Sequence, residues 1–374
     1  MLRILGLMAG LALGAAAETE RVYFGTSGNG EAKGIYTAEF DPETGAISGL
    51  KLAAAAPNPG FLVMAPDGKH LYATSSTKPA GGGRPTGAVA AFSVQDDGTL
   101  EEMNRRESGG GTCFVTIDPS GRCLLSANYG DGSVASFPVE KDGSVGERAS
   151  YFKHEGSSVN PDRQKEPHAH SFYPGPDNRR AYAPDLGIDR VKIYALDVSS
   201  GKTTAEGEAK TTPGSGPRHL KFSPDGKRAY VMGEMSLTVL VYDRDPEMGG
   251  LTLVQEAGVL AEGADGGGMT CSEILISPDG RFVYTANRDV AGKGRDSVTT
   301  FAVGDDGRLS RKAEVPAEVV IPRNIQLSPD GKWLLVAGQQ SGGVPVFRIG
   351  DDGTPAYAGH RAEVPQAMCI VFAP

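Results

Sequence analysis

Charged and histidine side chains recur at equivalent places in a repeated strand–turn–strand pattern of this 374-residue sequence. The set comprises Arg218, Arg288, Arg323, Asp185, Glu234, His168, His170 and His219. Arginines gathered in one pocket bind anions and stabilise a developing oxyanion, whereas a histidine or a carboxylate takes up or gives a proton. These residue types predict an anion-binding, hydrolytic or isomerising pocket.

Each of these residues also has a simpler interpretation. A lone charged side chain at the end of a strand is usually solvated and has no special role. Several such groups in one funnel are harder to explain in that way, because burying them costs free energy unless they pair or bind a ligand. The choice between the two interpretations depends on whether the fold brings these side chains together.

Six copies of a strand, a tight turn and a second strand indicate that fold. Each copy is centred on a turn of the form Pro-Asp-Gly or a close variant, flanked by β-branched and aromatic residues. Proline sets the first turn dihedral, Asp or Ser bonds the following backbone, and Gly takes the positive φ that other residues avoid. The turn prolines are Pro66, Pro119, Pro176, Pro224, Pro278 and Pro329, with steps of 53, 57, 48, 54 and 51 residues. Such a period is typical of propeller blades.

A third strand follows each hairpin, over residues 87–94, 132–139, 189–196, 237–244, 296–303 and 343–349. A polar turn and a fourth strand come next, and four strands make one blade. The last residues, 368–374, match only the innermost strand of a blade, whereas residues 21–27, 34–40 and 50–55 supply further strands. Pairing of the last strand with the first ones would close the ring and remove an open edge. The sequence thus predicts an all-β, seven-bladed β-propeller over residues 18–374, with four-stranded blades and a terminal blade shared between the chain ends.

Equivalent positions of the blades should form rings around the central channel. Six residues before each turn proline, the ring reads Gly60, Cys113, His170, Arg218, Ser272, Arg323 and Met368. Nine or ten residues after it, the ring reads Ser75 and Ser76, Asn128 and Tyr129, Asp185 and Leu186, Gly233 and Glu234, Asn287 and Arg288, Gly338 and Gln339. We expect both rings at one mouth, with His168 and His219 adjacent. The long polar loop over residues 154–166 either covers this mouth or is mobile.

Residues 1–17 have the pattern of a signal peptide. A charged start at Arg3 precedes an apolar or glycine run from Ile4 to Ala17, which ends in small residues at the expected cleavage site. The run has 14 residues, fewer than the roughly 20 that span a bilayer. A buried N-terminal strand or helix is the alternative. We expect a chain exported to the periplasm or the medium, without a membrane span and with its oligomeric state open.

Few other partners or cofactors are indicated. A formal charge of −9 argues against nucleic acid, because proteins that bind it usually present a basic face. The four cysteines include no Cys-x-x-Cys pair, so buried free thiols are expected, with one disulfide as the alternative in an oxidising compartment. His168 and His170 lack a third ligand at suitable spacing, and the glycine-rich segment 28–34 lacks dinucleotide-binding spacing. We therefore expect neither a metal ion nor another cofactor.

Ordered motifs extend over the whole mature chain: N-P-G-F-L, A-N-Y-G-D-G-S-V, P-H-A-H-S, A-P-D-L-G-I-D-R, G-S-G-P-R-H-L-K-F-S-P-D-G-K-R-A-Y-V, S-E-I-L-I-S-P-D-G-R-F-V-Y-T-A-N-R and I-P-R-N-I. In these motifs the chain resembles the propeller-type 6-phosphogluconolactonase family, which is related to fungal carboxymuconate cyclases. The resemblance implies a carboxylic ester hydrolase that opens a sugar δ-lactone, or an enzyme that lactonises a carboxylated muconate, without a metal.

The resemblance also implies catalytic roles for four residues already selected by ring position. His170 or Glu234 would activate water, while Arg218 and Arg288 would bind the substrate anion and stabilise the oxyanion. Ring position adds four expected substrate-binding residues: His168, Asp185, His219 and Arg323. Because a position at a channel mouth adds little to a core, we expect Glu234→Gln to leave the melting temperature nearly unchanged.

Two features depart from the family pattern. The family's phosphorylated lactone is made inside cells, whereas this chain has an export signal, so an unphosphorylated sugar lactone or another carboxylated lactone is expected. Gly233 stands where other members tend to place Asn. The competing functions are a non-catalytic exported propeller that binds a protein, a glycan or a cell-wall component, and a cyclase-like isomerase.

Overall fold

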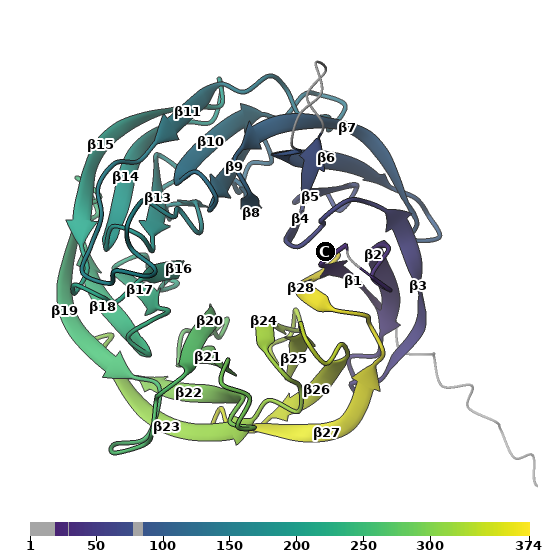
Figure 1. Ribbon diagram of the computed structural model, residues 1–374. Coiled ribbons are helices and arrows are strands. Elements are labelled where there is room, and N and C mark those ends of the chain that lie inside the picture. Colours follow the sequence, from purple (N-terminus) through teal and green to yellow (C-terminus); the bar gives the residue numbers. More distant parts are fainter. Residues whose placement is uncertain (1–18, 29, 78–84) are drawn as a thin grey trace, which may run out of the picture.

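The structure is a computed structural model that describes residues 19–28, 30–77 and 85–374. The predicted signal peptide, residues 1–17, lies outside these ranges. Seven four-stranded antiparallel sheets surround a central channel (Figure 1), and no residue in the described ranges is helical. It follows that the described part of the chain has no helix able to cross a membrane. The predicted seven-bladed, all-β propeller is confirmed.

The blades follow the chain order around the ring, each running outwards from an inner strand (Figure 1). Blade 1 contains β28 (Ala367–Phe372), β1 (Glu20–Thr26), β2 (Gly34–Phe40) and β3 (Ile47–Ala55). Blade 2 contains β4 (Leu62–Met64), β5 (His70–Thr77), β6 (Thr86–Val94) and β7 (Leu100–Gly109). Blade 3 contains β8 (Thr112–Ile117), β9 (Cys123–Asn128), β10 (Ser133–Pro138) and β11 (Ser150–Lys153).

The remaining blades repeat this pattern on the other side of the ring. Blade 4 contains β12 (Tyr173–Pro174), β13 (Arg180–Asp185), β14 (Arg190–Asp197) and β15 (Lys202–Lys210). Blade 5 contains β16 (Pro217–Phe222), β17 (Arg228–Gly233), β18 (Thr238–Arg244) and β19 (Leu251–Gly258). Blade 6 contains β20 (Met269–Ile276), β21 (Phe282–Asp289), β22 (Ser297–Val303) and β23 (Leu309–Pro316). Blade 7 contains β24 (Pro322–Leu327), β25 (Trp333–Gly338), β26 (Val344–Ile349) and β27 (Pro355–Ala362).

The inner hairpins depend on their turn residues. In blade 5, Gly226 has a φ of 69° and donates its N–H to the Ser223 carbonyl at 2.8 Å, and Asp225 accepts the N–H of Lys227. Blade 4 has no glycine at this place, and Asn178 takes the positive φ instead, at 52°. Asparagine tolerates this region better than most residues. Each turn therefore folds its two strands back tightly beside the channel.

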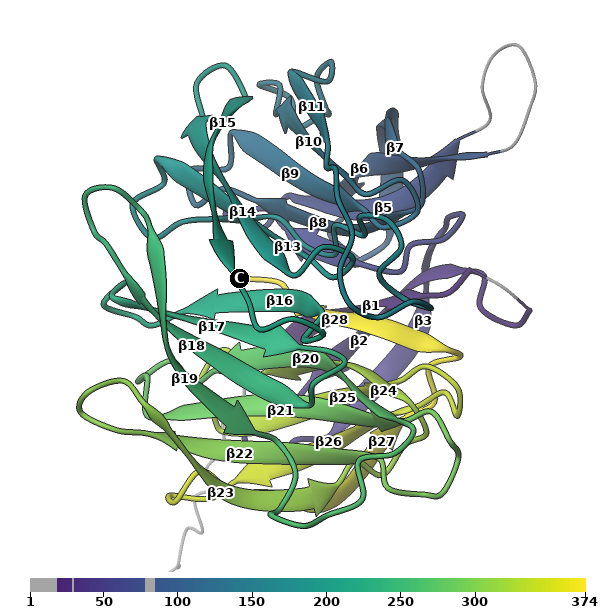
Figure 2. The same cartoon turned by 60° about the vertical axis from the view of Figure 1, so that its left-hand side comes forward.

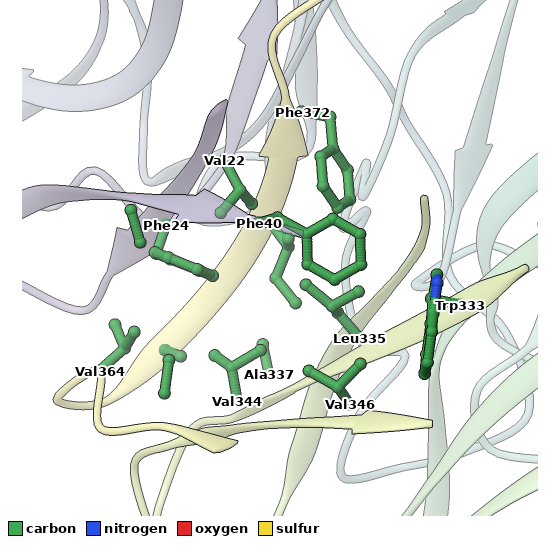
Figure 3. Packing of buried hydrophobic residues seen from close by; sticks show 14 residues of the cluster. Val22, Phe24, Phe40, Trp333, Leu335, Ala337, Val344, Val346, Val364 and Phe372 are labelled. Atoms are coloured by element: carbon green, nitrogen blue, oxygen red, sulfur yellow. The ribbon is translucent and has the colours of Figure 1, made fainter. Parts of the chain in front are cut away.

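The ring closes through blade 1. Strand β28 pairs antiparallel with β1, with Phe24 opposite Ile370, so the two ends of the chain share one sheet (Figure 2). Behind this pairing, blades 1 and 7 share a buried core in which Phe40 meets Phe372 edge to face at 5.3 Å and Trp333 at 6.4 Å (Figure 3). The predicted shared terminal blade is confirmed.

Candidate active site

Two neighbouring cavities lie at the end of the channel where the inner strands begin. The larger, of about 620 Å³, is lined by Gly111, Cys113, Tyr129, Arg163, His170, Glu234, Thr270, Arg288, Val290 and Arg323. The smaller, of about 300 Å³, is lined by Ser27, Asn58, Gly60, Phe61, Thr74, Thr112, Cys113, Arg218, His219, Arg323, Gln339 and Met368. Cys113 and Arg323 line both. The two cavities are therefore contiguous parts of one mouth.

β-Bulges in the inner strands direct side chains toward this mouth. In blade 5, Arg218 and His219 together stand opposite the single residue Met232, so two consecutive side chains reach the channel instead of alternating across the sheet. Blade 6 has the same irregularity at Ser272 and Glu273. Three further inner strands contain a one-residue bulge, at Cys113, Arg323 and Met368. Bulges often re-aim side chains next to active sites.

Glu234, which follows β17, is shared by three arginines. Its Oε2 atom lies 3.0 Å from Arg218 Nε and 3.2 Å from Arg288 Nη2, and its Oε1 atom lies 3.0 Å from Arg163 Nη2. Burial alone would raise the pKa of Glu234, but the surrounding arginines lower it to about 2. Glu234 is therefore fully ionised at neutral pH and holds the arginine cluster together.

Arg323 adds a positive charge that has no partner. Among the described residues, its guanidinium makes no hydrogen bond or ion pair, although it lines both cavities. Burial and the nearby charges of Arg218 and Arg288 lower the pKa of Arg323 to about 9. Within the described ranges, four arginines but only one carboxylate, Glu234, line the two cavities. Arg218 and Arg288 are buried and Arg323 is half-buried, and such a concentration of positive charge is costly unless an anion or a developing oxyanion binds there.

A second carboxylate, Glu273, holds Arg218 in place through His219. The Nδ1 atom of His219 lies 2.8 Å from Glu273 Oε1, and the amide of Asn324 donates to Glu273 Oε2 at 2.7 Å. Burial would raise the pKa of Glu273, but the hydrogen bond from His219 and the nearby charges of Lys221 and Arg218 lower it to about 2. An ionised Glu273 accepts the Nδ1–H of His219, which leaves Nε2 to accept from Arg218 Nη1 at 3.2 Å. His219 therefore acts as a neutral link between Glu273 and Arg218.

His170 enters the larger cavity just before β12. Its Nδ1 atom lies 3.9 Å from Cys113 Sγ, and its ring meets Tyr129 edge to face at 5.4 Å. Burial and the charges of Arg218 and Arg323 lower the pKa of His170 well below its usual value. The imidazole is neutral at pH 7 and keeps a lone pair for a proton. Burial raises the pKa of the Cys113 thiol to about 11, so Cys113 remains protonated.

The inner strand of blade 4 is interrupted beside His170. Pro184 in the partner strand β13 has no N–H to donate, so the ladder is reduced to an isolated Ala169–Asp185 bridge and a bond from the His170 N–H to the Pro184 carbonyl at 3.0 Å. Only Tyr173–Pro174 remains as the regular strand β12. This break lets the long loop over residues 154–166 lead directly into His170.

That loop is anchored at several places and reaches over the mouth. His154 bonds Asp185 Oδ2 at 2.6 Å, and the Gln164 amide donates to the Leu186 carbonyl at 2.8 Å. Its Arg163 contacts Glu234 and donates to the Tyr129 hydroxyl at 3.2 Å. The loop was expected either to cover the mouth or to be mobile, and these contacts agree with the first alternative. Ring position could not predict Arg163, because it considers only residues at the ends of strands. The one sequence feature that pointed to Arg163 was its place in the long polar loop before His170.

Two residues expected to bind substrate lie elsewhere. Asp185 is fully buried, and its other carboxylate oxygen accepts the N–H groups of His168 and Gly187. His168 stacks on Tyr129 at 4.3 Å and bonds its carbonyl through Nδ1. Of the residues that the structure describes, neither of these two lines either cavity. Both instead fix the loop and Tyr129, so their direct contact with substrate is not supported by the geometry.

The other six candidates come together as ring position predicted. Arg218 and His219 line the smaller cavity, His170, Glu234 and Arg288 line the larger one, and Arg323 lines both. Within the described ranges, no group of three or more His, Cys, Asp or Glu side chains is arranged to hold a metal ion. All four cysteines are unpaired, and three of them are buried.

Comparison with known proteins places this chain in a family. Residues 21–372 match the family model described as lactonase, seven-bladed β-propeller. The chain is 32% identical to the 6-phosphogluconolactonase of Bacillus subtilis over 354 residues, covering 94% of this chain and 97% of that protein. A 6-phosphogluconolactonase of Formosa agariphila is 30% identical over 343 residues, with 90% and 93% covered.

Solved structures give the same assignment. The periplasmic gluconolactonase PpgL of Pseudomonas aeruginosa superposes with a TM-score of 0.87 at 30% identity, covering 96% of this chain and 99% of that one. A putative 6-phosphogluconolactonase of Bacteroides uniformis gives 0.85 at 31% identity, with 95% and 99% covered. The chain therefore belongs to the lactonase family of seven-bladed β-propellers and resembles 6-phosphogluconolactonase.

Proposed function

We propose that this protein hydrolyses a sugar δ-lactone at the channel mouth, with the arginine cluster around Glu234 as the oxyanion site. The observation that carries this proposal is that, among the described residues, four arginines and one carboxylate line a mouth that also contains a neutral His170. Hydrolysis of a lactone develops negative charge on the carbonyl oxygen and yields a carboxylate. Both species match a site in which the positive charges outnumber the counter-ion Glu234.

His170 is the general base in this proposal. It takes a proton from a water molecule whose oxygen attacks the lactone carbonyl carbon, and the arginines stabilise the tetrahedral oxyanion. The bond from that carbon to the ring oxygen then breaks, and the ring oxygen takes the proton from His170. The resulting carboxylic acid ionises and releases one proton to solution, so the overall reaction consumes one water.

Glu234 has a different role. Both of its carboxylate oxygens are engaged by arginines, whereas, among the residues that the structure describes, the ring nitrogens of His170 make only a 3.9 Å contact with Cys113 Sγ. Its contacts with Arg218, Arg288 and Arg163 fit the role of a counter-ion that orients the arginines. Of the two bases that the family resemblance implies, His170 is therefore favoured.

The substrate is proposed to be unphosphorylated because the chain is proposed to be exported. The pattern of residues 1–17 supports export, and one structural relative is called a periplasmic gluconolactonase. Sequencing the N-terminus of the exported protein tests this part. A chain beginning at Glu18 is expected, whereas a cytoplasmic protein that still begins at Met1 would contradict it and favour a phosphorylated substrate.

The activity is tested with the purified mature protein in a pH-stat. The panel contains sugar δ-lactones, their phosphorylated counterparts and carboxylated muconates. Acid release above the uncatalysed rate with unphosphorylated sugar lactones is the expected result. Turnover of muconates alone would indicate a cyclase-like isomerase, and no turnover with any compound would favour a binding propeller.

A further inference from the structure

The smaller cavity is lined at one place by a residue without a side chain, Gly60, which precedes β4. At the ring position six residues before the turn proline, Gly60 is the only glycine among the seven residues. Gly60 does not have a positive φ, so its backbone does not require glycine. A Cβ atom there would lie 3.5 Å from Met368 Cε and 3.9 Å from Thr74 Oγ1, which is ordinary contact. A Cβ atom at position 60 would therefore be accepted by its neighbours, and we expect a larger side chain there to occupy part of the cavity that Gly60 lines.

The wall of the smaller cavity differs chemically from that of the larger one. Besides Arg218, His219 and the shared Arg323, its polar side chains are neutral amides and hydroxyls, and none of the described carboxylates lines it. The amides and hydroxyls are Ser27, Asn58, Thr74, Thr112 and Gln339. The side-chain amide of Gln339 has no hydrogen-bond partner within the described ranges. Phe61 supplies an aromatic surface. Amides that both donate and accept, beside an aromatic ring, suit a neutral ligand with many hydroxyls and apolar C–H faces.

The two cavities together are larger than one lactone ring needs. The larger cavity alone, at about 620 Å³, falls within the range of roughly 300–1,000 Å³ that holds drug-sized ligands. The smaller one adds about 300 Å³ across the shared residues Cys113 and Arg323. A substrate whose lactone lies beside His170 can therefore extend past Arg323 toward Gly60.

We infer that the smaller cavity is a subsite for a second sugar residue, so that the preferred substrate is an aldonolactone carrying a glycosyl group. This inference rests on the proposed lactone hydrolysis. The arginines of the mouth would bind the lactone carbonyl, and the amides and hydroxyls of the smaller cavity would bind the hydroxyls of the attached sugar. Gln339 and Phe61 would then contact the glycosyl group without touching the reacting atoms.

The test compares glucono-δ-lactone with a 4-O-glycosyl gluconolactone, such as the lactone of maltobionic acid. The parent is expected to show a kcat/KM at least about tenfold higher for the glycosylated lactone. Gly60→Leu occupies part of the cavity and should abolish this preference while changing kcat/KM for glucono-δ-lactone less than about twofold. Two control variants should behave as the parent. Gly60→Ala leaves most of the space in the cavity, and Gln326→Ala changes an amide nearer the other end of the channel. Gln339→Ala should lose part of the preference.

Equal kcat/KM values for the two lactones in the parent, or an equal loss of both in Gly60→Leu, would overturn the subsite. Calorimetry with the stable products, gluconate and maltobionate, measures binding without turnover. It therefore distinguishes a failure of the subsite from a failure of the proposed reaction. If maltobionate binds at least about tenfold more tightly and Gly60→Leu removes the difference, the subsite holds even without turnover. If gluconate and maltobionate bind alike, the subsite is wrong whether or not lactones are hydrolysed.

Discussion

The Nε atom of Arg218 lies 3.0 Å from Glu234 Oε2, and relative exposure is only 2% for Arg218 and 4% for Glu234. Arg218 comes from the bulge at the start of β16, and Glu234 follows β17, the next strand of the same blade. Arg288 from blade 6 and Arg163 from the loop contact the same carboxylate. One side chain thus balances charges from three separate parts of the propeller.

Glu234→Gln should therefore destabilise the fold, contrary to the expectation from its place at a channel mouth. The substitution leaves the buried Arg218 and Arg288 without their shared carboxylate, and removing one partner of a buried ion pair costs about 3–5 kcal/mol. Sulfate added at 0.1 M should restore part of the loss by occupying the vacant anion position. Chemical denaturation of the parent, Glu234→Gln and the control Glu39→Gln measures the effect. Glu39 pairs with Arg21 at the surface, where a loss of about 0–1 kcal/mol is typical; equal stabilities of the two variants would contradict this account.

Glu273 should act on the reaction through Arg218. Glu273→Gln removes the charge that fixes the His219 tautomer, so Arg218 loses a defined acceptor and kcat/KM should fall by about tenfold. Arg218→Ala should cost about 10² or more, as for other removed oxyanion donors. If Glu273 works through Arg218, the double variant should be no slower than Arg218→Ala alone. Losses that multiply in the double variant would indicate an independent structural role.

The rate of lactone hydrolysis should not fall in mildly acidic solution. The base form of His170 is lost only when the ring protonates, and its pKa is well below the usual value. The kcat/KM profile is therefore expected to stay level as pH falls through 6.5 and to decline only at lower pH. The free energy of unfolding should decrease as the pH falls below 6.5. In the unfolded chain His170 and His219 take up protons near that pH, whereas folded His219 has a pKa of about 4 and folded His170 has a pKa well below its usual value. A rate that halves near pH 6.5 would contradict the assigned state of His170.

Phe372→Ala tests the closure of the ring without truncating the chain. Phe372 packs against Phe40 in the core between blades 1 and 7 (Figure 3), and a buried phenylalanine replaced by alanine typically costs 3–5 kcal/mol. Tyr357→Ala, at an exposed position on β27, is the matched control. We expect a lower denaturation midpoint for Phe372→Ala only. A midpoint equal to that of the control would show that the last strand contributes little to closure.

The fold and much of the mouth were predictable from the sequence because both follow from one periodicity. The turn prolines fix the blade count, and counting from them places Arg323, Glu234 and Arg288 at one end of the channel. Strict alternation in a strand, however, gives no reason for Arg218 and His219 to face the same side. The bulge that achieves this has no clear signature in the residues themselves.

Counting residues from the turn prolines also does not predict which side chains form hydrogen bonds with one another. Asp185 occupies a ring position, yet His154, far away in the sequence, engages it in the interior. Arg163 lies in a loop outside any repeat and still reaches Glu234. Such contacts depend on how a loop folds back over the blades, which no local pattern specifies.

The most direct test of the proposed reaction is the initial rate of hydrolysis of a sugar δ-lactone by the parent and by two histidine variants. His170→Ala removes the proposed base, and His70→Ala removes a histidine that pairs with Asp67 in a turn outside the mouth. With folding verified by circular dichroism, the account predicts that His170→Ala loses a factor of about 10² or more in kcat/KM, whereas His70→Ala keeps the parental value. A folded His170→Ala protein with a near-parental rate would contradict the account.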